Sequence, residues 1–156
     1  MKKVLLLVIL AVTYVIVAAQ SKSIERFRKL HKEDQNVFFY SSTIKMLNAE
    51  NEPEFADLIK DIDKVMVLLY EKDKQKLKTE EIAGLKNDLH EEKYVPLLLI
   101  NENGNTINLY KRDKKEKTVG FAALVDNKDN FVIIDVKGSI DFKKFIEFKN
   151  KIDLKL

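Results

Sequence analysis

The chain has 156 residues, with 28 Lys and Arg against 25 Asp and Glu, 46% hydrophobic residues and no cysteine. This length suits about one domain. The missing cysteines exclude a disulfide scaffold, a thiolate metal site and a cysteine nucleophile. The near balance of charge excludes a strongly basic nucleic-acid-binding protein, so we expect no nucleic acid among the partners.

Residues 1–19 have the pattern of a secretory signal peptide. Two lysines follow the initial methionine, an apolar run extends from Val4 to Val17, and small residues lead to Ala19. A basic start, an apolar stretch of this length and a small-residue exit are the features that signal peptidase recognises. We predict cleavage after Ala19, which leaves residues 20–156 as a single α+β domain that is exported to the periplasm or secreted.

The same apolar run has a second interpretation as an uncleaved membrane anchor. A spanning helix needs about 20 apolar residues, and this run has about 14. Polar residues follow it at once, starting with Gln20. Cleavage is the better interpretation, and contact with the membrane is then confined to the signal peptide before it is removed.

The first half of the remaining chain alternates helical and extended patterns. Apolar residues recur at helical spacing in some segments, while others are short runs of β-branched and aromatic residues. The expected elements are a helix capped by Ser23, a strand over 36–41, a short helix over 43–47, a helix starting at Pro53, a buried strand over 65–70 and a helix capped by Thr79. The inner stripe of the first helix is expected to be Ile24, Phe27 and Leu30, and that of the last of these helices Ile82, Leu85 and Leu89.

From Tyr94 onward the pattern is extended. Residues 94–100 and 106–112 are expected to pair across Asn103-Gly104, since Asn-Gly is a strong hairpin signal. Residues 119–125 and 131–137 form a second pair. Gly138 then ends the strand, and Ser139 is expected to cap a closing helix with Phe142, Phe145, Ile146 and Ile152 on its apolar side.

This order of elements predicts a fold of the α+β class. Strands joined by short turns pair antiparallel, and helices cover a sheet in a second layer. We therefore expect a two-layer sandwich with a mostly antiparallel sheet, a C-terminal four-strand meander, helices packed on the sheet and a closing C-terminal helix.

Motifs of known chemistry are missing from the sequence. His31 and His90 have no second histidine at metal-binding spacing, and the serines lack the nucleophile motif of hydrolases. Asp126 and Asp129 do not meet the calcium-loop spacing and suit a turn. The basic run over 111–117 is diluted by acidic residues and suits a solvated hairpin loop. We expect no catalytic residue, no cofactor and no metal.

The stretch from Phe131 to Phe145 resembles the closing strand and helix of the domain-of-unknown-function family numbered 4252, small exported proteins typical of Bacteroidetes-type bacteria. The family pattern is a strand, a glycine and an Ile-Asp-hydrophobic step into the last helix. The order of the earlier elements is also similar. The resemblance implies an exported protein of unassigned role and transfers no site. The matching residues are Val132, Ile134, Gly138, Ile140, Asp141 and Phe142.

Two strands, 65–70 and 95–100, are apolar on both faces, which raises the question of what covers the second face. One interpretation is that the first helix, or the helix after Pro53, crosses to that side and buries it. The other is an exposed apolar patch, which usually marks an interaction site. The predicted interaction face consists of Met66, Leu68, Leu98, Ile100, Tyr110, Phe131 and Ile133.

These observations favour a non-catalytic binding or interaction module of the bacterial cell envelope. Its expected partner is an unidentified envelope protein or a second copy of the chain. The alternative is a small-ligand carrier or an enzyme with a dispersed polar site, which would need a pocket with convergent polar groups.

Overall fold

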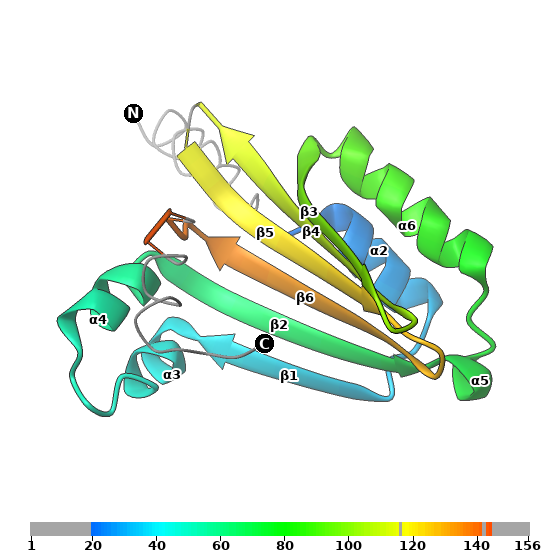
Figure 1. Cartoon of the computed structure of the whole chain (residues 1–156), viewed down its shortest axis with the longest axis horizontal. Helices are drawn as coiled ribbons and strands as arrows, with labels where there is room; N and C mark the ends of the chain where they lie inside the picture. Colours follow the sequence, from blue (N-terminus) through cyan, green and yellow to red (C-terminus); the bar gives the residue numbers. More distant parts are fainter. Residues whose placement is uncertain (1–19, 116, 142, 145–156) are drawn as a thin grey trace, which may run out of the picture.

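The computed structural model describes residues 20–115, 117–141 and 143–144. Within them, six antiparallel strands form one sheet in the order β1-β2-β6-β5-β4-β3 (Figure 1). The predicted α+β class and the four-strand meander, β3 to β6, are therefore confirmed. The strands are β1 (Gln35–Tyr40), β2 (Ile62–Glu71), β3 (Tyr94–Glu102), β4 (Asn105–Lys114), β5 (Lys117–Asp126) and β6 (Asn130–Gly138).

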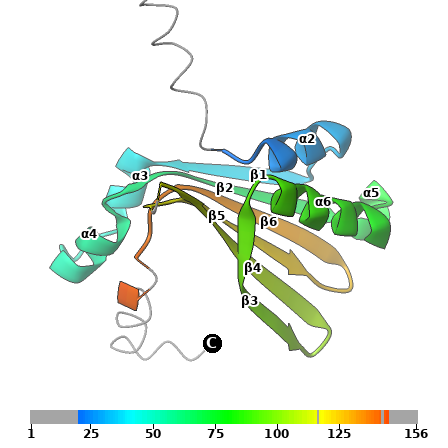
Figure 2. The same ribbon diagram turned by 90° about the horizontal axis from the view of Figure 1, so that it is seen from above.

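The helices are distributed unevenly around this sheet. Figure 2 shows α2 and α6 together on one side, with α3 and α4 at one end of the strands. No helix in the described ranges is long and apolar enough to cross a membrane. The described helices are α2 (Lys22–Leu30), α3 (Ser41–Met46), α4 (Pro53–Ile59), α5 (Lys72–Gln75) and α6 (Thr79–Glu91).

The main core lies between the sheet and the pair α2 and α6. The apolar stripe predicted for α6, which is Ile82, Leu85 and Leu89, is buried there as expected. From α2, Ile24 and Phe27 are buried. Their large apolar side chains against one sheet face provide most of the driving force that holds the two layers together.

Several predicted helix boundaries shift by one or more residues. The N-cap of α2 is Ser21, whose side chain accepts a hydrogen bond from the Ile24 N–H, while Ser23 lies inside the helix. Leu30, predicted on the inner stripe, is 74% exposed at the end of α2. The helix α6 is preceded by Lys78, whose N–H donates to the Glu81 carboxylate, so Thr79 is its first residue.

The hairpin between β3 and β4 turns at Asn103 and Gly104, as predicted. Both have positive φ, 49° and 79°, which is the backbone shape of a tight two-residue turn that matches the strand twist. At the other end of the meander, Asp141 accepts hydrogen bonds from the N–H groups of Lys143 and Lys144, so Asp141 takes the capping role predicted for Ser139. The rest of the predicted closing helix, with Phe142, Phe145, Ile146 and Ile152, lies outside the described residues.

Candidate functional site

The sheet face opposite α2 and α6 is apolar across its whole width. Cross-strand pairing aligns its apolar side chains in two rows. The first row has one residue from each strand, and the second has one from each strand except β1, where Gln35 lies opposite Leu69. We call this surface the open face. Its first row is Val37, Val67, Ile134, Ala123, Leu109 and Leu98, and its second row is Leu69, Val132, Val125, Ile107 and Ile100.

Each of these eleven side chains is partly or largely exposed. Exposure reaches 46% at Val37, 44% at Leu98 and 37% at Ile100. The described helices gather elsewhere: α2 and α6 lie on the other side of the sheet, and α3 and α4 lie at one end (Figure 2). Neighbouring β-branched and aliphatic side chains on one sheet face normally pack beneath a second layer, so the open face is an unusual feature of this fold.

One end of the same sheet face is covered. There, Ile44 of α3 and Leu58 and Ile59 of α4 form a small buried cluster with Ile62, against which Phe39, Phe55, Val65, Val136 and Ile140 pack. A hollow of about 730 Å³ adjoins this region and opens to the surface. Its lining combines apolar, basic and acidic groups: Leu97, Val119, Phe121, Ile140, Lys111, Lys117, Thr118, Ser139, Asp61 and Asp141.

The interaction face predicted from the sequence is wrong for five of its seven residues. Met66, Leu68, Tyr110, Phe131 and Ile133 are at most 8% exposed, because α2 and α6 cover them. The structure agrees with the other interpretation, in which the first helix crosses to the sheet face that carries these residues and buries it. Those five residues belong to the main core.

The other two predicted residues, Leu98 and Ile100, are exposed but lie on the opposite face from the core. The register of β3 against β4 shifts between Pro96 and Leu98, which is a β-bulge. An extra residue in one strand moves every later side chain to the other face of the sheet. Strict alternation along β3 would therefore place Leu98 on the same sheet face as Met66, whereas the bulge places it on the opposite face.

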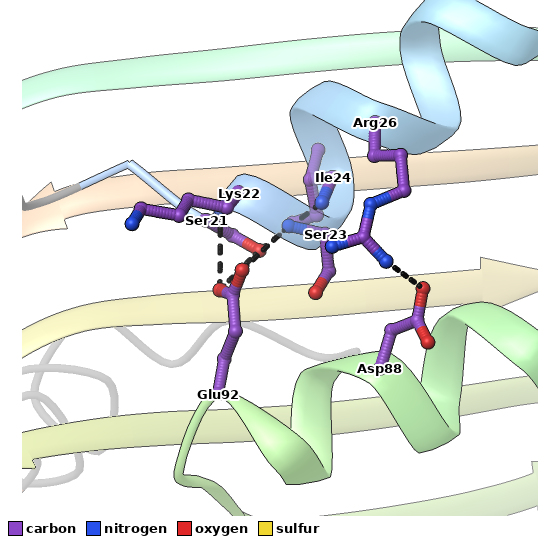
Figure 3. Close-up of polar contacts among 7 residues, drawn as sticks. All are labelled: Ser21, Lys22, Ser23, Ile24, Arg26, Asp88 and Glu92. Atoms are coloured by element: carbon purple, nitrogen blue, oxygen red, sulfur yellow. Dashed lines mark hydrogen bonds and ion pairs between the residues drawn. The ribbon is translucent and has the colours of Figure 1, made fainter.

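A carboxylate after α6 holds the start of α2 in place. Figure 3 shows Glu92 directed at the first turn of α2. Its oxygens accept hydrogen bonds from the N–H groups of Ser23 at 2.7 Å and Lys22 at 3.2 Å, and from the Ser21 hydroxyl at 3.0 Å. The first N–H groups of a helix have no partner within the helix, and a negative charge there also suits the helix dipole.

A second link joins the same two helices, since Arg26 of α2 pairs with Asp88 of α6 at 3.3 Å (Figure 3). This pair is largely exposed and contributes little, as surface ion pairs usually do. Glu92 is more sheltered, with its side chain 17% exposed, and its carboxylate lies 3.8 Å from the Arg112 guanidinium. We infer that Glu92 is the principal polar link between α2 and the rest of the domain.

We expect Glu92→Gln to lower the free energy of unfolding by about 1–3 kcal/mol, because charge-assisted bonds to otherwise unpaired N–H groups are lost. Urea denaturation measures this. The control is Glu91→Gln at the neighbouring exposed residue, which should leave the urea midpoint unchanged. Equal midpoints for the two variants would contradict the role assigned to Glu92.

One acidic side chain is buried beneath the same helix. Asp135 of β6 is 1% exposed and faces the α2 side of the sheet. Neither carboxylate oxygen has a hydrogen bond of normal geometry within the described part of the chain. Burial raises the pKa of Asp135 to about 7, and the Ser21 N–H and the Arg112 guanidinium only partly oppose this.

His31, considered above as a possible metal ligand, lies beside an aromatic ring of α2 and a carboxylate of α6. The His31 ring packs on Phe27 with centroids 4.5 Å apart, and its Nε2 lies 3.8 Å from Glu81. Among the described residues, no group of three His, Cys, Asp or Glu lies close enough to hold a metal ion.

The loop between β5 and β6 forms a turn. The Asn127 side chain accepts from the N–H groups of Asp129 and Asn130, and Asp126 pairs with Lys72. The basic run over 111–117 begins within β4, where Lys111 pairs with Asp113 at 2.7 Å.

In the part of the chain that the structure describes, the fold and its surface define a class: a small α+β protein built on one antiparallel sheet, with α2 and α6 on one face and an apolar open face on the other. Residues 21–148 match the family described as domain of unknown function (DUF4252), and the chain belongs to this family. The resemblance found in the sequence is therefore confirmed. The match begins at Ser21, the residue that caps α2. A comparison with curated proteins finds no match.

Proposed function

We propose that this protein is an exported, non-catalytic binding protein of the bacterial cell envelope, and that it binds an apolar surface of a protein partner on the open face. The observation that carries the proposal is the pair of apolar rows across the sheet, with eleven partly or largely exposed side chains. Contiguous apolar patches of several hundred Å² on a soluble protein usually mark interaction sites.

The partner that suits this surface is an amphipathic helix. A sheet face lined by aliphatic side chains is normally completed by helices, as α2 and α6 complete the other face here. The two rows offer no charged side chain to recognise a polar ligand. Affinity would therefore come from burying apolar area, at about 25 cal/mol per Å² before the costs of association are subtracted.

Export is the second component of the proposal. Its support is the predicted signal peptide over 1–19 together with the position of Ser21, which is fully buried at the start of the folded domain. The family match over residues 21–148 also begins directly after the predicted cleavage site at Ala19. Intact-mass measurement on protein isolated from the native host tests this, and a full-length chain in the membrane fraction would contradict it.

A small-ligand carrier is the second candidate, favoured by the hollow beside the open face. Its volume of about 730 Å³ lies in the usual range of ligand pockets, and Leu97, Val119 and Phe121 supply an apolar lining. Lys111 and Lys117 would suit an anionic headgroup, but Asp61 and Asp141 lie on the same rim. The mixed charge of the rim makes this candidate the weaker one.

Binding of an apolar fluorescent dye tests the open face directly. We expect the purified protein to bind the dye, and Val132→Lys to reduce the fluorescence several-fold, because the charge lies within the second row. The matched control is Leu30→Lys, an equally large change at a residue that is 74% exposed on α2. That variant should leave dye binding unchanged, and both variants should unfold near the wild-type urea midpoint.

Photo-crosslinking in intact cells then tests for a protein partner. A photoreactive residue at Ile134 or Leu109 should capture one and the same polypeptide, while the same group at Leu30 should not. Weak dye binding, combined with a strongly lowered stability of Val132→Lys, would mean that the chain covers this face itself. That result would overturn the proposed function.

A further inference from the structure

The strand β3 forms one edge of the sheet. It pairs with β4 on one side, and within the described ranges no strand pairs with its other side. Past the bulge its side chains are exposed on both faces: Leu98 at 44% and Ile100 at 37% on the open face, and Leu99 at 59% on the helix face. Figure 2 shows the far end of β3 extending beyond α6, which explains the exposure of Leu99.

Proteins usually protect such an edge with charges, prolines or bulges. In β3 the proline and the bulge come early, at Pro96 and the residue after it, and the first charged residue is Glu102. The segment over 98–101, which follows the bulge, has the sequence Leu-Leu-Ile-Asn and carries none of these devices. It therefore presents unpaired backbone N–H and C=O groups between apolar side chains.

The opposite edge strand, β1, has cations close to its aromatic side chains. Arg28 lies 5.3 Å and Lys64 lies 4.6 Å from the ring centre of Phe38, and Lys64 also lies 5.6 Å from the ring of Tyr40. Charged groups beside an edge strand disfavour the approach of a second strand. The two edge strands thus differ: charged groups lie beside β1, whereas the end of β3 after the bulge carries only uncharged side chains up to Glu102.

We propose that two copies of this protein pair antiparallel through β3, about a two-fold axis at Leu99. In this register Leu99 lies opposite Leu99 of the second copy, and Leu98 lies opposite Ile100, so these three side chains each meet an apolar side chain on the same face. The bulge residue Leu97 falls opposite Asn101. Glu102 falls opposite Pro96, and no two like charges face each other. An isologous contact of this kind closes as a dimer.

The pairing also joins the open faces of the two copies. Leu98 ends the first apolar row and Ile100 ends the second, so each row continues into the other row of the second copy. A shift of the register by two residues would place either Leu98 opposite Glu102 or Ile100 opposite Pro96, and each of these shifts breaks one of the two rows. Continuity of the rows is therefore the reason to assign a second copy, and not an unrelated strand, to this edge. The proposed dimer does not depend on partner binding at the open face, because Leu99, on the two-fold axis, lies on the helix face.

The chain contains no cysteine, so a single introduced cysteine gives an unambiguous crosslink. Only the residue on the two-fold axis lies opposite its own copy, at a Cα separation within reach of a disulfide. We expect Leu99→Cys to form a disulfide-linked dimer under mild oxidation of the native protein. Asn101→Cys on the same strand, and Val37→Cys on the β1 edge, should remain monomeric.

Light scattering after size exclusion tests the unlinked protein. We expect a concentration-dependent rise to twice the monomer mass, and Leu99→Lys should raise the dissociation constant at least tenfold, while Val132→Lys on the open face leaves the dimer intact. A strictly monomeric protein at several hundred micromolar would overturn the proposal. Crosslinking of Asn101→Cys as efficient as that of Leu99→Cys would overturn it as well.

Discussion

Replacement of Gly138 by alanine is expected to lower the free energy of unfolding by about 2–5 kcal/mol, the sum of a strained backbone and an overpacked contact. Gly138 ends β6 with φ at 126°, a conformation that side-chain-bearing residues rarely adopt. A Cβ there would lie 2.2 Å from the carbonyl oxygen of Asp61 and 2.8 Å from the Cα of Ile62. Both contacts are with backbone, so the start of β2 would have to move.

The second glycine to test lies in α6. Gly84 is in the middle of the helix, and a Cβ added there would meet no heavy atom within 4 Å. Gly84→Ala should therefore raise the free energy of unfolding by about 1 kcal/mol, the helix-propensity difference. Urea denaturation of both variants measures the contrast, and a midpoint for Gly138→Ala equal to that of the wild type would show that the β2–β6 contact is looser than described.

Local signals in the sequence are sufficient to predict many elements. The helical spacing of Ile82, Leu85 and Leu89 correctly places the buried side of α6, and the Asn103-Gly104 pair correctly places the turn between β3 and β4. These patterns work because each depends on interactions within a few residues. Gly138 is also predicted correctly as the end of a strand, although its close approach to Asp61 depends on a contact that no local pattern indicates.

The faces of the sheet cannot be assigned in the same way. Which face the helices cover depends on contacts such as that of Glu92 with Ser21, which are 71 residues apart in sequence. The bulge after Pro96 then reverses the side of Leu98 and Ile100. Proline within a strand often accompanies an edge or a bulge, so Pro96 is the one available signal for this reversal.

The burial of Asp135 cannot be recognised from the sequence either. Alternation alone predicts that it shares a sheet face with Phe131 and Ile133, but it does not show that this face lies in the core. Its burial has a consequence for stability. The ordinary pKa of 3.8 is raised to about 7 in the folded protein, first by burial and further by the nearby carboxylates of Glu25 and Glu92. Between these two values the folded state binds more protons than the unfolded state, so the contribution of Asp135 to stability falls as the pH rises from about 4 to 7 and is constant above that.

We therefore expect Asp135→Asn to be more stable than the wild type at pH 8, by about 2–4 kcal/mol, since each pKa unit between folded and unfolded states corresponds to about 1.4 kcal/mol. At pH 4 the two proteins should have similar stability, because the wild-type carboxyl is then protonated and neutral in the folded state. Urea denaturation at several pH values measures the difference, in which the contributions of all other acidic groups cancel. A difference for Asp135→Asn that does not vary with pH would mean that the carboxylate is solvated in solution, and that the start of α2 does not seal this part of the core.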